Sequence, residues 1–121
     1  MTSSGSDLAV TVRQDGEASV LTVSGDVDMA TAPTLTRHVE AVLSGRPAAV
    51  VVDLERVTYL ASAGITALVQ LTIDTHAARI PCCLVATGRV VLRPLELTGV
   101  APNLVIRPTL GAARSWLREQ R

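Results

Sequence analysis

Apolar and polar residues follow one another along the chain in patterns that predict strands and helices in turn. Residues 8–13 carry an apolar side chain at every second position, which is the period of a half-exposed strand. Asp15 and Gly16 form a tight-turn signal, so residues 18–23 are predicted to return as the second strand of a hairpin. We expect this antiparallel pair at one edge of a sheet, with its second strand towards the centre.

A longer apolar run predicts the next strand. Residues 48–52 lack polar alternation, which is typical of a strand covered on both faces. We therefore expect a central, parallel strand here. A polar break at Glu55 and Arg56 follows, and a helix is expected to begin at the small residues around Ser62.

Apolar residues at helical spacing predict four helices. The predicted helices are residues 33–43, 63–78, 89–97 and 109–119, with further strands at residues 82–86 and 104–106. Thr31, before Pro33, is the candidate N-cap of the first helix. Strands alternating with helices indicate an α/β fold with a mixed, largely parallel sheet of four to five strands.

The length and composition fit a single packed domain. The chain has 121 residues, of which 48% are apolar, enough for one core. We expect a flexible tail at residues 1–7 and one domain over residues 8–119. The apolar runs are too short for a membrane span and the first residues lack the features of a signal peptide, so we expect a cytoplasmic protein.

Charge and cysteine usage exclude several kinds of site. Eleven basic residues, all of them arginine, balance eleven acidic residues, so no basic field favours nucleic acid or an anionic membrane. Cys82 and Cys83 are adjacent in a predicted strand, which points them to opposite faces and disfavours a disulfide between them. His38 and His76 lack metal-ligand spacing, so we expect neither a metal site nor a cofactor.

Ser62 lies where the central strand is predicted to turn into a helix. A serine here is a favoured N-cap, because its hydroxyl can accept a backbone N–H of the first turn. A phosphate on the same hydroxyl would meet free N–H groups and the positive end of the helix dipole. Capping alone is the simpler interpretation, and modification of the serine is the functional one.

The residues around Ser62 favour the functional interpretation. They read DL-x-x-VTYL-x-SAGI over residues 53–65. This string resembles the signature of the STAS domain family, the bacterial anti-sigma-factor antagonists. The resemblance implies that Ser62 is the serine phosphorylated by a partner kinase. Many members have Asp before this serine and Ser after it, whereas this chain has Ala61 and Ala63.

The resemblance extends to the loop after the second predicted strand. Residues 25–28 match the family's Gly-acidic-hydrophobic-Asp loop, which forms part of the surface that the kinase meets. It thus implies a partner surface that includes Asp26 and Asp28 together with Ala61, Ala63 and Gly64. Considered without the resemblance, the two aspartates are turn and helix-start residues.

These observations lead to one main hypothesis and two alternatives. The main one is an anti-sigma-factor antagonist that binds an anti-sigma factor with serine kinase activity, releases a sigma factor, and is switched off by phosphorylation of Ser62. The first alternative is an unphosphorylated STAS module that senses a ligand or serves as a structural subunit. The second is a small enzyme of flavodoxin-like layout, although no Gly-x-Ser-x-Gly elbow or nucleotide-binding loop is present. The oligomeric state is left open between a monomer and a weak dimer.

Overall fold

The described residues form one mixed five-stranded sheet with helices on both sides. A computed structural model describes residues 8–120, so the tail predicted at residues 1–7 lies outside the described residues. The strands are β1 (Leu8–Asp15), β2 (Ala18–Val27), β3 (Ala49–Leu60), β4 (Cys82–Val85) and β5 (Ile106–Arg107). The helices are α1 (Ala32–Ser44), α2 (Ser62–Ala77), α3 (Arg89–Leu97) and α4 (Leu110–Glu119), with a short 3-10 helix, η2 (Ala101–Asn103), before β5.

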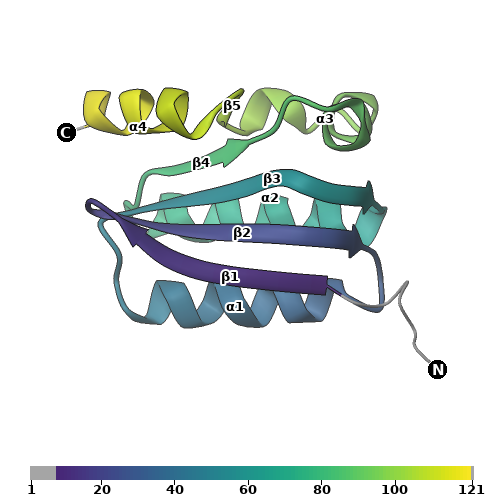
Figure 1. Cartoon of the computed structure of the whole chain (residues 1–121), viewed down its shortest axis with the longest axis horizontal. Helices are drawn as coiled ribbons and strands as arrows, with labels where there is room; N and C mark the ends of the chain where they lie inside the picture. The colour runs from purple at the N-terminus through teal and green to yellow at the C-terminus, as the bar shows by residue number, and fades with distance from the viewer. Residues whose placement is uncertain (1–7, 121) are drawn as a thin grey trace.

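The strand order is β1-β2-β3-β4-β5 (Figure 1). β1 and β2 form an antiparallel hairpin at one edge, and the remaining neighbours are parallel. β3 is the central strand, and Val50, Val51 and Val52 are at most 1% exposed. The predicted α/β fold, the hairpin at the edge and the central parallel strand are all confirmed.

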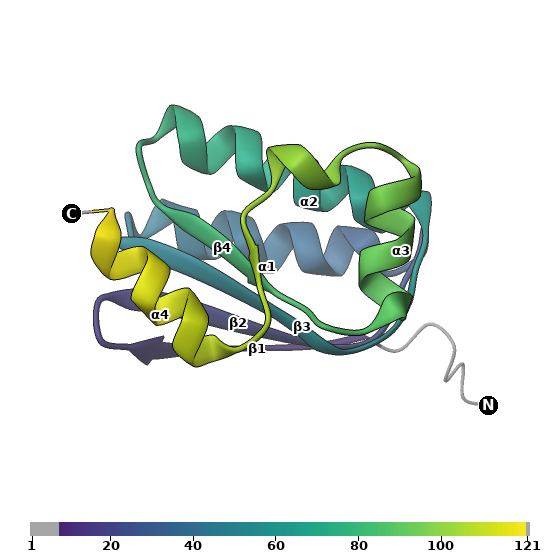
Figure 2. The same cartoon turned by 90° about the horizontal axis from the view of Figure 1, so that it is seen from above.

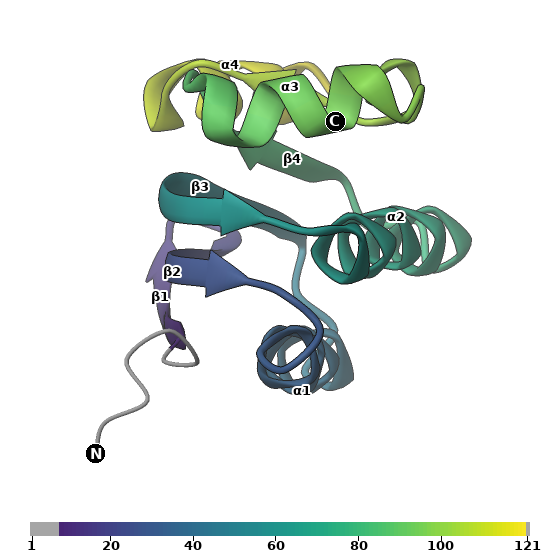
Figure 3. The same cartoon turned by 90° about the vertical axis from the view of Figure 1, so that its right-hand side faces the viewer.

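Side chains of β3 alternate between two apolar layers. Val50 and Val52 pack against α1 and α2, which lie side by side on one face of the sheet (Figure 3), whereas Val51 belongs to a smaller cluster under α4 on the other face. Cys82 packs against the layer under α1 and α2, whereas Cys83 belongs to the cluster under α4, and both are free thiols. The prediction that they point to opposite faces is therefore confirmed.

Two strands are longer than the sequence predicted. β2 continues through Gly25, and β3 continues through the polar pair Glu55 and Arg56. The register between the two strands shifts twice in this region, so that extra residues of β3 bulge out. Gly25 has φ +107°, a conformation that glycine adopts without steric cost. The bulges keep the strands paired and turn the apolar side chains of β3 back to the core after the polar pair.

The last strand is shorter and later than predicted. β5 covers Ile106–Arg107 instead of residues 104–106, because the 3-10 helix η2 occupies the approach to it and Leu104 turns into the main core. It is still an edge strand, as expected. α4 follows, with Thr109 as its N-cap: the hydroxyl accepts a hydrogen bond from the N–H of Ala112 at 3.0 Å. Seen from above, α3 and α4 lie near opposite ends of the sheet (Figure 2).

Candidate functional site around Ser62

Ser62 is the first residue of α2, and Ala61 occupies the N-cap position. The predicted capping role of Ser62 is therefore wrong. The Ala61 carbonyl accepts hydrogen bonds from the N–H groups of Gly64 and Ile65, so the backbone closes the first turn without help from a side chain. The Ser62 side chain is exposed and makes no hydrogen bond with the described residues. Its hydroxyl is thus free for chemistry that the fold does not need.

Gly64 fixes where this serine lies. A Cβ at this position would come within 2.6 Å of Val27 Cγ1 and 2.7 Å of Leu60 Cδ1. Only glycine allows the first turn of α2 to pack this closely against the ends of β2 and β3. The N–H of Ala61 also bonds to the carbonyl of Val27 at 2.9 Å. Ser62 is thereby held at the carboxyl ends of the two strands. Gly64 itself is buried, so it positions the predicted partner surface from below and is not exposed on it.

The loop between β2 and α1 lies beside this turn and is held by side chains. Asp28 Oδ1 accepts hydrogen bonds from the N–H groups of Ala30 at 2.9 Å and Thr31 at 3.0 Å. Thr31 is 2% exposed and holds the N-cap position of α1, as predicted, but its hydroxyl makes no cap bond. Instead it accepts from the N–H of Asp28 and donates to the carbonyl of Asp26.

Asp26 links the two strands that lead to the site. Thr58 Oγ1 donates a hydrogen bond of 2.6 Å to Asp26 Oδ1, across the register in which Asp26 faces Tyr59. Asp28 is thus a turn residue before α1, as its residue type suggested, whereas Asp26 lies near the end of β2 and not in a turn or at a helix start. Both remain half-exposed, so each also contributes negative charge to the surface.

Two exposed apolar side chains complete this surface. Met29, in the loop, is 83% exposed, and Tyr59, at the end of β3, is 54% exposed. The sequence alone did not indicate either residue, because apolar residues near a strand end are usually read as core. We define the Ser62 face as Asp26, Asp28, Met29, Tyr59, Ala61, Ser62 and Ala63. It combines small and apolar groups with two carboxylates.

The start of α3 is also fastened to β3. Glu55 accepts hydrogen bonds from the N–H of Thr87 at 3.0 Å and from its hydroxyl. Glu55, which the sequence suggested as part of a break, therefore positions the turn before α3. Arg89 and Arg93 are exposed on that helix.

The two histidines lie elsewhere. Nδ1 of His38 is 2.9 Å from the carbonyl oxygen of Thr34 in α1. His76 is in the last turn of α2, and Ser62 is in the first turn of the same helix, about 20 Å away at 1.5 Å per residue. Within residues 8–120 no three His, Cys, Asp or Glu side chains are grouped closely enough to hold a metal ion. Nor does this part of the chain contain a helix with the length and apolar character to span a bilayer.

Comparison with known proteins matches the STAS domain over residues 9–113. The anti-sigma-F factor antagonist RsfB of Mycobacterium tuberculosis is 31% identical over 111 residues, covering 92% of this chain and 90% of the relative. The crystal structure of an anti-sigma factor antagonist from Mycobacterium paratuberculosis has a TM-score of 0.89 and 32% identity, covering 97% and 99% of the two chains.

A more distant structure is that of the Bacillus cell fate determinant SpoIIAA in its phosphorylated form. It has a TM-score of 0.68 and 16% identity, and the match covers 91% of this chain and 100% of that one. At this identity the likeness concerns the fold alone.

Proposed function

This chain belongs to the STAS domain family, and from that premise we propose that it is an anti-sigma factor antagonist switched off by phosphorylation of Ser62. The mycobacterial relatives, which match nearly the whole chain and are named as such antagonists, support the first part. The exposed, unengaged hydroxyl of Ser62 carries the second. In this role the protein docks on an anti-sigma factor, frees a sigma factor, and acts in the bacterial cytoplasm.

A phosphate at Ser62 is compatible with the fold. The hydroxyl is exposed and makes no hydrogen bond within the described residues, so its modification breaks no contact of the native state. The first turn of a helix also presents backbone N–H groups and the positive end of the helix dipole, which favour an anion. Phosphorylation is therefore expected to change the surface and leave the packing intact.

The same phosphate is expected to oppose docking. The Ser62 face presents Met29 and Tyr59 as apolar contacts, and Asp26 and Asp28 already supply negative charge. A phosphate adds about −1.5 to −2 charges at neutral pH, which a partner must either leave hydrated or bury at a cost. A loss of about 1.4 kcal/mol is enough to weaken binding tenfold.

The positions of the two histidines favour a binding role over that of a serine hydrolase. His76 is at the far end of α2 from Ser62, and the ring of His38 is engaged with Thr34. Catalysis by a serine nucleophile requires a base within hydrogen-bond reach. The hydroxyl of Ser62 is therefore proposed as a substrate for a kinase on the partner, and the role of the Ser62 face is recognition.

The test is a phosphorylation assay with the anti-sigma factor recovered by affinity capture from a bacterial extract. We expect the captured protein, with ATP, to phosphorylate this chain at Ser62, located by mass spectrometry. Ser62→Ala should abolish the signal. Ser44→Ala should retain it, because Ser44 is also exposed but lies at the C-terminal end of α1. Capture of an anti-sigma factor without phosphate on Ser62 would favour the unphosphorylated module.

A further inference from the structure

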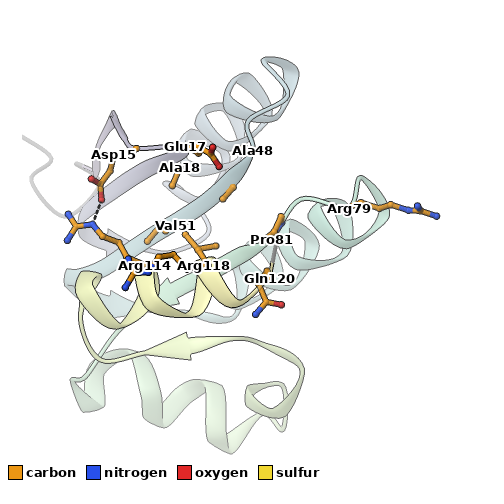
Figure 4. Close-up of a pocket in the computed structure, with 13 residues that line it drawn as sticks. Asp15, Glu17, Ala18, Ala48, Val51, Arg79, Pro81, Arg114, Arg118 and Gln120 are labelled. Atoms are coloured by element: carbon orange, nitrogen blue, oxygen red, sulfur yellow. Dashed lines mark hydrogen bonds and ion pairs between the residues drawn. The ribbon is translucent and has the colours of Figure 1, made fainter.

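A second site lies at the end of the sheet opposite Ser62. A cavity of about 430 Å³ is enclosed by the turn between β1 and β2, the first residues of β2 and β3, and the C-terminal half of α4 (Figure 4). β3 starts in this cavity at Ala49 and ends at Leu60 next to the Ser62 turn, about 35 Å further along at 3.3 Å per residue. The volume of the cavity is in the range of small-molecule sites, about 300 to 1,000 Å³.

Small residues create the space. Ala18, Ala49 and Val51, which are at most 7% exposed and belong to the cluster under α4, form the apolar floor of the cavity, and Gly16 and Ala48 line the approach. None of these side chains is larger than valine. The floor is therefore apolar and made of small side chains, which suits a ring or a short branched hydrocarbon.

Arginines line the side formed by α4. Arg114 and Arg118 are one helical turn apart, and both line the cavity. Nε of Arg114 donates to Asp15 Oδ2 at 2.6 Å, a contact that uses none of the four N–H donors on its two Nη groups. Nη2 of Arg118 donates one hydrogen bond to the hydroxyl of Ser115, at 3.1 Å. Arg79 also lines the cavity but its side chain points away from it (Figure 4).

We propose that this cavity binds a small organic carboxylate with a flat apolar body, seated on Ala18, Ala49 and Val51, with its carboxylate on Arg118 and Arg114. A guanidinium fork matches the geometry of a carboxylate and can bind it through two parallel hydrogen bonds. The acids lining the cavity are Asp15, which is paired with Arg114, and Glu17. Arg114 and Arg118, the two arginines on the α4 side, balance these two acids in charge, so the N–H donors of their guanidinium groups, and not a net positive charge, favour a carboxylate.

The test is a titration of the 15N-labelled full chain with 2-naphthoate, followed by NMR. Saturable shifts are expected at the amides of Gly16, Ala18 and Ala49, and none at Ala63. 2-Naphthol, which has the same ring without the carboxylate, should bind more weakly by about fivefold, which corresponds to the ~1 kcal/mol of a well-formed exposed ion pair.

Variants make the proposal specific. Arg118→Gln should weaken 2-naphthoate binding by about fivefold, for the same reason. Arg37→Gln is the matched control and should leave it unchanged, because Arg37 is likewise exposed and bonded to a hydroxyl three residues earlier in its helix. Ala48→Leu should fill the approach and prevent binding. The proposal is overturned if no saturable shifts occur, if both Arg118→Gln and Ala48→Leu bind like wild type, or if inorganic phosphate shifts the same amides as strongly.

Discussion

Replacing Gly64 with alanine should loosen the junction between β3 and α2. The added Cβ would lie 2.6 Å from Cγ1 of Val27 and 2.7 Å from Cδ1 of Leu60, well inside van der Waals contact. These neighbours are 0% and 4% exposed, so neither can move aside without disturbing the core around it. The clash must be relieved by a shift of the first turn of α2, which carries Ser62.

Two effects of opposite sign set the change in the free energy of unfolding of Gly64→Ala. An extra carbon in a packed core costs about 1–3 kcal/mol. Alanine in place of glycine within a helix gains up to about 1 kcal/mol. Because the contact at Gly64 involves two buried neighbours at once, we expect the steric cost to win, with a net loss of about 1–2 kcal/mol.

Urea denaturation of both the Gly64→Ala variant and a matched control decides this prediction. Gly111 is also in the first turn of a helix, α4, but a Cβ there meets only Thr109 Oγ1 at 3.8 Å, an ordinary contact. Gly111→Ala should therefore raise the unfolding midpoint, whereas Gly64→Ala should lower it with an unchanged slope. If Gly64→Ala is as stable as wild type, the close packing at this junction does not require glycine and the reasoning fails.

Three further predictions concern the side chains around the two sites. Ser62→Ala should change the free energy of unfolding by less than about 0.5 kcal/mol, since the hydroxyl makes no native hydrogen bond; a loss near 1 kcal/mol in urea melts would restore its role as a cap. Asp28→Ala should cost about 1–2 kcal/mol in the same assay, because Oδ1 accepts two backbone N–H groups; a neutral result would contradict this. The hydrogen bond from Arg114 lowers the pKa of Asp15, so its carboxylate stabilises the fold fully above the pKa of the unfolded chain and loses that effect as pH falls through the lower, folded value. The free energy of unfolding of wild type should thus exceed that of Asp15→Asn by a constant margin from neutral pH down to about pH 4, the usual pKa of an aspartate carboxyl. Below that pH the two values should converge. A constant difference down to about pH 2 would refute the pairing.

Hydrophobic periodicity was enough to predict the order of the strands and helices and the central place of β3. It did not predict the bulges in β3, because these depend on the register with β2, which local periodicity does not report. Without the bulges, Glu55 and Arg56 looked like the end of a strand. With them, β3 runs on and brings Tyr59 to the surface.

A site residue could be predicted from the sequence only where one short segment shows both its reactive group and its place in the fold. Ser62 stood out because a small hydroxyl residue followed a strand and preceded a helix. Its capping role was wrong because the helix begins one residue earlier than the predicted residue 63, which moves the N-cap to Ala61. The cavity near Ala49 was beyond prediction, since three segments distant in sequence meet there only in the folded chain.

The measurement that tests the account most directly is the affinity of three forms of the protein for the captured anti-sigma factor. Wild type, Ser62→Ala and Ser62→Asp are compared by calorimetry at two salt concentrations, after circular dichroism has shown that all three are folded. Alanine leaves the Ser62 face small and neutral at this position, so Ser62→Ala should bind like wild type.

A fixed carboxylate at residue 62 adds negative charge beside Asp26 and Asp28 and must be desolvated or held off by the partner. We therefore predict that Ser62→Asp binds at least about tenfold more weakly than wild type, a cost of about 1.4 kcal/mol. The deficit should be larger at low salt than at high salt, because screening reduces repulsion between exposed charges. Binding of Ser62→Asp with wild-type affinity at both salt concentrations would contradict the proposed phosphorylation switch.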